Sequence, residues 1–122
     1  MIGYVTLGTN DLDRAATFYD ALLAPVGAKR LWDMPRGIAW GRSEDTPILA
    51  VMKPFDGAPA TVGNGVMVGL NLDNKEAVEA MHRQALALGG KDEGAVGMRG
   101  DSWYCGYFRD LDGNKLLAFC MV

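Results

Sequence analysis

The strongest constraint in this sequence is an internal repeat, because a repeat fixes the order of structural elements in both halves of the chain at once. Residues 3–28 align without a gap on residues 66–91. The aligned pairs include Val5 with Val68, Leu7 with Leu70, Leu23 with Leu86 and Gly27 with Gly90. Apolar residues recur at the same positions in the two halves, and a glycine follows the aligned segment's helix in both. This agreement predicts one supersecondary unit that the chain uses twice.

Each half begins with a predicted strand and a predicted helix. Residues 4–9 and 66–72 show the period-2 pattern of strands. Asn10 or Asp11, and Asp73 or Asn74, then offer side-chain oxygens that cap helix starts. Apolar residues follow at three- and four-residue steps, as on one helix face. They are Leu12, Ala15, Ala16, Tyr19, Leu22 and Leu23 in the first half, and Ala77, Val78, Met81, Ala85 and Leu88 in the second.

Three short strands are predicted after each helix. They span residues 28–34, 37–42 and 47–53 in the first half, and residues 91–96, 103–109 and 115–121 in the second. A hairpin turn at residues 110–114, with Gly113 free to take a positive φ, joins the last two. A Gly- and Pro-rich linker, residues 54–63, connects module 1–53 to module 64–122. Since each module is small for independent stability, we expect a single domain over residues 1–122.

The composition is that of an ordinary globular protein and argues against several partners. The formal net charge of −3 and the scattered basic residues disfavour nucleic acid, which requires a concentrated basic surface. The start of the chain lacks the features of a signal peptide, and no apolar run approaches the roughly 18 residues of a membrane span. We therefore expect a cytoplasmic location and no membrane partner. Cys105 and Cys120 are expected to be buried thiols, with a disulfide between neighbouring strands as the alternative.

Several motifs accompany the repeat: the opening residues 3–12 (GYVTLGTNDL), the helix pair Phe18-Tyr19 and the tail at residues 107–116 (YFRDLDGNKL). With the two βαβββ modules, they resemble the vicinal-oxygen-chelate superfamily, which includes glyoxalase, bleomycin resistance proteins and extradiol dioxygenases. The resemblance covers nearly the whole chain. It implies an α+β fold in which the modules form a curved, U-shaped, eight-stranded mixed sheet with helices outside and a cleft inside. It also implies a homodimer.

Metal-dependent members of this superfamily, as the resemblance implies, take one ligand from each of four strands, usually His or Glu. The matching positions are Tyr4, Ala50, Met67 and Leu117. These side chains supply no imidazole, carboxylate or thiolate, so we predict no metal and no cofactor. The single histidine, His82, falls on the second predicted helix, where we expect a partly exposed residue. Because a Ser-His-Asp set or a Cys-His pair cannot be built around it, no catalytic residue is assigned.

The side chains that replace the ligands are mostly apolar or aromatic, and strand alternation predicts that they line the cleft. The predicted ligand-binding residues are Tyr4, Trp40, Met52, Met67, Arg99, Trp103, Tyr107 and Leu117. Such a lining suits an apolar or aromatic small molecule. Arg99 falls in a glycine-rich stretch, residues 94–102. As a mobile flap beside the cleft, this stretch would let Arg99 meet an anionic ligand; the alternative, which the sequence favours, is an exposed arginine without a ligand role. Arg36 and Lys53 are expected to form surface salt bridges, with polar ligand contacts as the alternative.

Three functions remain. The first is a metal-free glyoxalase/bleomycin-resistance-like protein that binds or sequesters a small apolar or aromatic molecule. The second is a family enzyme, a lyase or isomerase, with a rearranged site in which Tyr4, Tyr107 and Arg99 are the available acid or electrostatic groups. The third is a structural or interaction protein whose cleft is plugged by these same side chains. The residues favour the first, without bleomycin itself, because a cationic glycopeptide favours an acidic groove.

Overall fold

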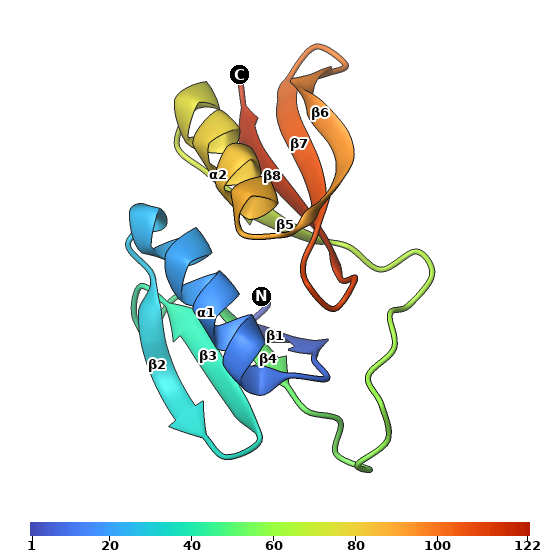
Figure 1. Cartoon of the computed structure of the whole chain (residues 1–122). Coiled ribbons are helices and arrows are strands. Elements are labelled where there is room, and N and C mark those ends of the chain that lie inside the picture. Colours follow the sequence, from blue (N-terminus) through green and yellow to red (C-terminus); the bar gives the residue numbers. More distant parts are fainter. The chain divides into compact units, whose positions relative to one another are not determined.

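A computed structural model describes all 122 residues of the chain, which divide into two compact units, Met1–Val62 and Gly63–Val122. Each unit has the predicted βαβββ order and its own four-stranded sheet (Figure 1), so the α+β class is confirmed. The first unit contains β1 (Tyr4–Gly8), α1 (Leu12–Leu23), the short 3₁₀ helix η1 (Ala24–Val26), β2 (Lys29–Met34), β3 (Gly37–Gly41) and β4 (Ile48–Met52). The second contains β5 (Val68–Asn71), α2 (Lys75–Ala87), β6 (Lys91–Arg99), β7 (Trp103–Arg109) and β8 (Lys115–Met121).

The first sheet has the strand order β1-β4-β3-β2, with β1 parallel to β4 and the other pairs antiparallel. Helix α1 starts at the predicted cap, where the Asp11 side chain accepts a hydrogen bond from the Arg14 N–H. It ends before Gly27, whose φ of 81° is the left-handed conformation that favours glycine. Figure 1 shows α1 lying across one face of this sheet. The sheet therefore has one face covered by α1 and a second face that this helix does not cover.

The covered face of the first sheet carries its large side chains. Ile38 and Trp40 from β3 are opposite Val51 and Leu49 from β4, and none of the four is more than 8% exposed. They pack beneath buried residues of α1 such as Tyr19, whose ring centroid is 5.5 Å from that of Trp40. Burying an apolar side chain of this size stabilises the fold by roughly 1.5–3 kcal/mol. This layer is the core of the first unit.

Asp20 of α1 ties the helix to the sheet. Its Oδ1 accepts hydrogen bonds from Trp40 Nε1 at 2.8 Å and from Arg30 Nε at 3.0 Å, while Arg30 Nη2 donates to its Oδ2 at 2.7 Å. The Arg30 guanidinium, with a further contribution from the Trp40 N–H, lowers the pKa of Asp20 from its ordinary value, and partial burial opposes this effect. The charged form of Asp20 is therefore the form that stabilises the first unit.

The second sheet has the corresponding order β5-β8-β7-β6, with β5 parallel to β8. Phe108 from β7 and Leu116, Ala118 and Cys120 from β8 face α2 and are at most 2% exposed. Helix α2 is capped at its N-terminus by Asn74, whose side chain accepts a hydrogen bond from the Ala77 N–H. The β7–β8 hairpin has the predicted turn. Asp110 Oδ1 accepts from the backbone N–H groups of Asp112 and Asn114, and Gly113 has a φ of 89°.

Two predictions for the second unit are wrong. The strand predicted at residues 91–96 does not end there, because β6 continues through the glycine-rich stretch to Arg99 and the hairpin turns only at residues 100–102. His82 is not partly exposed: it is 7% exposed, and its Nε2 lies 3.2 Å from both Asp92 Oδ1 and the Tyr107 carbonyl oxygen. The backbone N–H of Gly94, and after it His82, lower the pKa of Asp92. His82 is thus a hydrogen-bonded residue in the packing between α2 and the sheet.

Cys105 and Cys120 are both buried free thiols, as predicted. They lie on adjacent strands but on opposite faces of the second sheet, because Cys105 is opposite Phe119 in the β7–β8 register and successive residues of a strand alternate.

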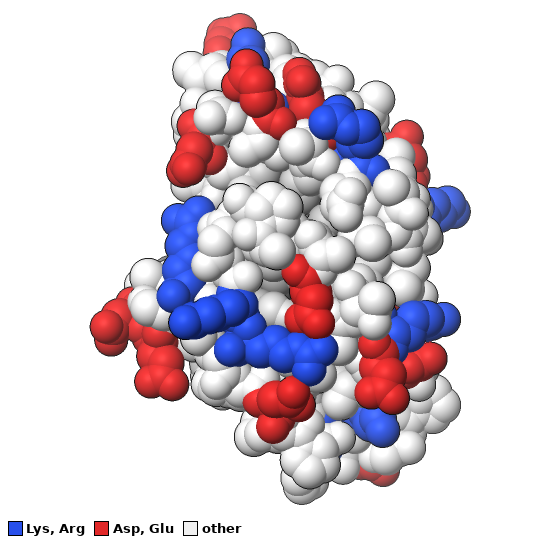
Figure 2. Space-filling view, turned by 60° about the vertical axis from the view of Figure 1, so that its left-hand side comes forward, with Lys and Arg blue, Asp and Glu red and all other residues white.

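No helix of the chain is long and apolar enough to cross a membrane. On the face of the molecule drawn in Figure 2, Lys and Arg side chains lie among Asp and Glu side chains.

We predict that Asp20→Asn destabilises the first unit at neutral pH by roughly 1 kcal/mol, a small value because the Asp20 side chain is 44% exposed and solvent screens the pair. A lowered folded-state pKa gives stability that is present above the unfolded pKa and is lost as the pH falls through the folded value. The variant should therefore lose less stability than the wild type between about pH 5 and pH 2. Urea unfolding followed by tryptophan fluorescence measures this.

The matched control is Asp45→Asn in the exposed turn between β3 and β4, which should retain the wild-type pH dependence. Identical acid profiles for Asp20→Asn and the wild type would contradict the role assigned to Asp20.

Candidate functional site

The face of the first sheet that α1 does not cover has a floor of small residues. Gly37, Ala39 and Gly41 alternate with the large residues of β3, and Ala50 is opposite Ala39 in β4. Ala39 and Ala50 are both 0% exposed. Because these positions extend little or no side chain above the backbone, the centre of this face is hollow unless larger residues reach over it. We call it the open face.

Larger side chains from the flanking strands border the open face. The rings of Tyr4 on β1 and Trp32 on β2 meet edge to face, with centroids 5.5 Å apart and an interplanar angle of 75°. Trp32 and Met52 pack against the buried cluster of Ala39, Ile48 and Ala50. Met52 also lies directly over Gly37, in space that any Cβ would occupy. Two aromatic rings and a flexible thioether therefore surround the small-residue floor.

A hollow of about 500 Å³ remains beside these side chains. Its volume lies within the range of about 300–1,000 Å³ that is usual for small-molecule sites. Tyr4 and Met34 on its wall are 59% and 46% exposed, and Phe55 at its rim is 92% exposed. The hollow is lined by Tyr4, Thr6, Leu7, Gly8, Trp32, Met34, Arg36, Met52, Lys53, Pro54 and Phe55. It is the candidate functional site of the first unit.

Of the predicted ligand-binding residues of the first unit, Tyr4 and Met52 line this hollow, and Trp40 does not. The expected inward direction of Trp40 is wrong, because its ring packs on Tyr19 and its N–H is bonded to Asp20 on the covered face. Both faces of β3 are apolar, so the period-2 pattern alone cannot orient this strand. The difference in size was the available signal, since only small residues alternate with Ile38 and Trp40.

The predicted residues of the second unit share the uncovered face of the second sheet. Leu117 is opposite Tyr107 in the β7–β8 register, and Trp103 is stacked on Phe119 with ring centroids 4.9 Å apart. The guanidinium carbon of Arg99 lies 5.4 Å from the centroid of the Tyr107 ring. Met67 precedes β5 and is 42% exposed. Arg99 is thus held in strand β6 beside an aromatic ring.

Sequence reasoning missed Trp32, Met34 and Phe55 as wall residues of the hollow. A bulge between Arg30 and Trp32 shifts the phase of β2, so its pattern cannot be read from the residues at its start. The apolar residues Trp32 and Met34, two apart, were the available signal. Phe55 is in the stretch predicted as a linker, where nothing in the pattern separates a wall residue from a connecting one.

The residues present do not fit a metal ion. No group of three or more His, Cys, Asp or Glu side chains is placed to hold one. Tyr4 lies on the open face, and Ala50 is buried in its floor at 0% exposure. In the second unit, Leu117 is 7% exposed and Met67 supplies only a thioether. The four positions that match the superfamily's ligands therefore carry no imidazole, carboxylate or thiolate.

Two βαβββ modules, each with a helix on one face of a mixed four-stranded sheet, define a glyoxalase-type fold. The family model of the Glyoxalase/Bleomycin resistance protein/Dioxygenase superfamily matches residues 1–117. The chain belongs to this superfamily, and it lacks a metal-ligand group of the kind the resemblance implies.

Solved structures of the superfamily are similar over almost the whole chain. A glyoxalase/bleomycin resistance protein from Albidiferax ferrireducens T118 is 33% identical with a TM-score of 0.90, and the match covers 98% of each chain. A family enzyme from Burkholderia phytofirmans PsJN is 16% identical with a TM-score of 0.78, again over 98% of each chain. A lactoylglutathione lyase from Agrobacterium tumefaciens is 21% identical with a TM-score of 0.71, over 98% of this chain and 92% of that one. No curated protein matches the chain.

We predict that Zn²⁺, Ni²⁺ and Mn²⁺ leave the melting temperature of the protein unchanged, and that a chelator does the same. A metal that binds only the folded state raises the melting temperature by mass action, and its removal lowers it. Thermal unfolding with each ion, together with elemental analysis of protein purified without chelator, checks this. A stoichiometric metal whose removal lowers the melting temperature would show that the ligand positions have been misassigned.

Proposed function

We propose that this protein binds a small apolar or aromatic molecule, without a metal, on the open face of the β1-β4-β3-β2 sheet. The observation that carries the proposal is the hollow beside Trp32 and Met52, whose lining includes the ring of Tyr4 and the exposed side chains of Met34 and Phe55. An aromatic ligand in this hollow would cover side chains that are exposed in the free protein. Each Å² of apolar surface removed from water contributes about 25 cal/mol to binding, before the entropic cost of association.

The chemical character of the wall supports recognition of a flat molecule. Tyr4 and Trp32 offer ring faces and edges for offset or edge-to-face stacking. Met52 and Met34 adapt to the outline of a ligand because their side chains are unbranched and flexible. Thr6, which is opposite Ala50 in the β1–β4 register, adds a hydroxyl to this wall. Such a wall is selective for shape more than for a particular hydrogen-bonding pattern.

Binding is favoured over lyase or isomerase chemistry by the titratable groups that line this site. They are the phenol of Tyr4, the guanidinium of Arg36 and the ammonium of Lys53, whereas the lining contains no carboxylate and no imidazole. A lyase or isomerase of the ordinary acid–base type needs a group that accepts a proton near neutral pH. The three groups present are instead suited to donating hydrogen bonds and to attracting negative charge.

The proposal predicts that a neutral aromatic probe, 2-naphthamide, binds the protein and that Thr6→Glu weakens this binding at least about tenfold. The new carboxylate would lie in the lining of the hollow. A bound ring would remove water from this carboxylate at a cost of several kcal/mol, unless the side chain moved away. Thr6 is exposed in the free protein, so the substitution should leave the fold intact. Isothermal titration calorimetry measures the affinity, and the rise in melting temperature with probe concentration provides a second readout.

The matched control is Thr17→Glu on the exposed side of α1, which should bind the probe as the wild type does. Equal weakening by both variants would show that the probe is not on the open face. If no member of an aromatic fragment library raises the melting temperature of the wild type, the hollow is not a binding site, and the plugged-cleft role replaces this proposal.

A further inference from the structure

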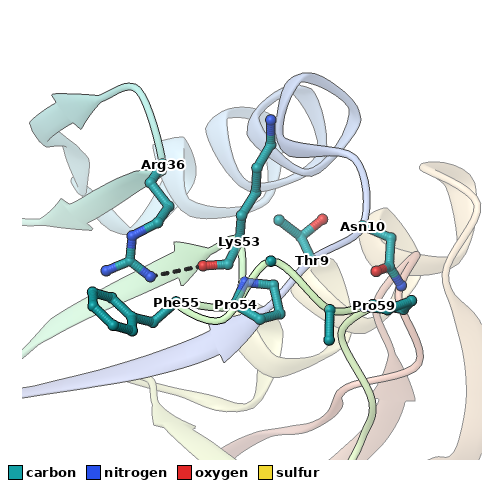
Figure 3. Close-up of a pocket in the computed structure, with 9 residues that line it drawn as sticks. Thr9, Asn10, Arg36, Lys53, Pro54, Phe55 and Pro59 are labelled. Atoms are coloured by element: carbon teal, nitrogen blue, oxygen red, sulfur yellow. Dashed lines mark hydrogen bonds between the residues drawn. The ribbon is translucent and has the colours of Figure 1, made fainter.

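A second hollow, of about 530 Å³, lies at the end of the first sheet. The chain after β4 forms its wall, and Asn10 fixes this segment at one point. The Asn10 Nδ2 group donates to the Ala60 carbonyl at 3.2 Å, and its Oδ1 accepts from the Ala60 N–H at 2.7 Å. Figure 3 shows Pro54 of this segment near Thr9, Pro59 near Asn10, and Phe55 beside the Arg36 guanidinium. The wall is thus a defined part of the first unit and not a free connection.

The two hollows adjoin, because Arg36, Lys53, Pro54 and Phe55 line both of them. The hollow on the open face adds mostly apolar side chains such as Trp32. The end hollow adds two polar residues, the 1% exposed Thr9 and the exposed Asn10, and the small or apolar Gly57, Ala58 and Pro59. A molecule that extended from one hollow to the other would therefore pass the two cationic residues that line both.

Arg36 is held in place at this junction. Its Nη1 donates to the Lys53 carbonyl oxygen at 2.8 Å, and its guanidinium carbon lies 5.4 Å from the centroid of the Phe55 ring. A guanidinium has five N–H donors, so most of those on Arg36 remain for a ligand. Figure 3 shows the Lys53 side chain extending away from the Arg36 guanidinium. Arg36 is the fixed cation of the junction, and Lys53 is the one that can adjust.

Arg36 and Lys53 also differ from Arg30 and Arg109 in their partners. Arg30 pairs with Asp20 and Asp33, and Arg109 pairs with Glu93. Neither Arg36 nor Lys53 forms an ion pair with an acidic side chain, contrary to the surface salt bridges expected from the sequence. The one nearby acid of the segment, Asp56, accepts a hydrogen bond from the Ala58 N–H in its own turn. Two positive charges are thus left uncompensated at the edge of an apolar hollow.

We propose that the ligand of the open face is an aromatic or apolar carboxylic acid, whose carboxylate binds Arg36 and Lys53 at the junction of the two hollows. This inference rests on the proposed binding function and adds the charge and orientation of the ligand to it. The apolar body lies against Tyr4, Trp32 and Met34, and the carboxylate accepts hydrogen bonds from the remaining guanidinium donors of Arg36. A planar carboxylate matches the planar fork of a guanidinium, and charge-assisted hydrogen bonds of this kind are stronger than neutral ones.

The test compares two ligands of nearly equal shape, 2-naphthoate and neutral 2-naphthamide, by isothermal titration calorimetry. The wild type should bind the naphthoate about three- to tenfold more tightly than the amide, since the pair of charges is partly solvated. Raising the salt concentration should reduce this preference and leave amide binding unchanged, because only the charged contact is screened.

Arg36→Gln and Lys53→Gln locate the carboxylate. Each should weaken naphthoate binding more than amide binding, and Arg36→Lys should restore part of the preference for naphthoate. The matched control is Arg42→Gln, because Arg42 follows the far end of β3 and likewise donates to a backbone carbonyl, that of Val26. This control should keep the full preference. The melting temperature of each variant without ligand is the folding control, and Lys53→Gln tests the site if Arg36→Gln does not fold.

The outcomes separate this inference from the function on which it rests. If the two ligands bind the wild type equally, the open face is a binding site and the carboxylate contact is wrong. If naphthoate is preferred but the preference survives both Gln variants, the anion binds elsewhere and the assignment to Arg36 and Lys53 is overturned. If neither ligand binds, the proposed function fails and this inference fails with it.

Discussion

The first unit depends on the segregation of side chains by size along β3. Ile38 and Trp40 face α1, whereas Gly37, Ala39 and Gly41 face the other way. The large side chains supply the apolar contact that holds the helix on the sheet. The small ones leave room on the opposite face, where Trp32 from β2 and Met52 from β4 pack over them. The same strand therefore shapes both the core and the surface beside which the hollow lies.

Most of the fold could be predicted from the sequence because each element has a local signal that agrees with its counterpart 63 positions away, as Val5 agrees with Val68. The helix periodicity and the caps at Asp11 and Asn74 agree between the two halves in this way. The β7–β8 turn has a local signal of its own. The errors occur where tertiary contacts outweigh local pattern. Glycines disfavour a strand, yet β6 continues to Arg99 because Gly94 and residues 97–99 pair with β7 around an irregularity. His82 is buried because Asp92 and a backbone carbonyl accept its hydrogen bonds.

The candidate site was less predictable than the fold. Tyr4 and Met52 could be placed on the open face because Tyr4 and Ala50 match ligand positions of the superfamily and Met52 is two residues from Ala50. The facing of Trp40 depended on a choice between two apolar faces of one strand. Trp32 depends on a bulge, which the sequence does not mark. The junction cations are a third case. Arg36 and Lys53 are far apart in sequence and unremarkable in type, and only the fold shows that the backbone of one accepts a hydrogen bond from the side chain of the other.

The open face also explains why a metal site and this hollow are incompatible in the first unit. Ala50, at a position that matches a metal ligand, is 0% exposed beneath the packing of Trp32 and Met52. An imidazole or carboxylate there would occupy the space above the floor and displace both side chains, leaving a polar group among apolar ones. The walls that shape the hollow therefore require a small residue at this position. Recognition in this unit thus rests on apolar shape, with charge supplied from its edge by Arg36 and Lys53.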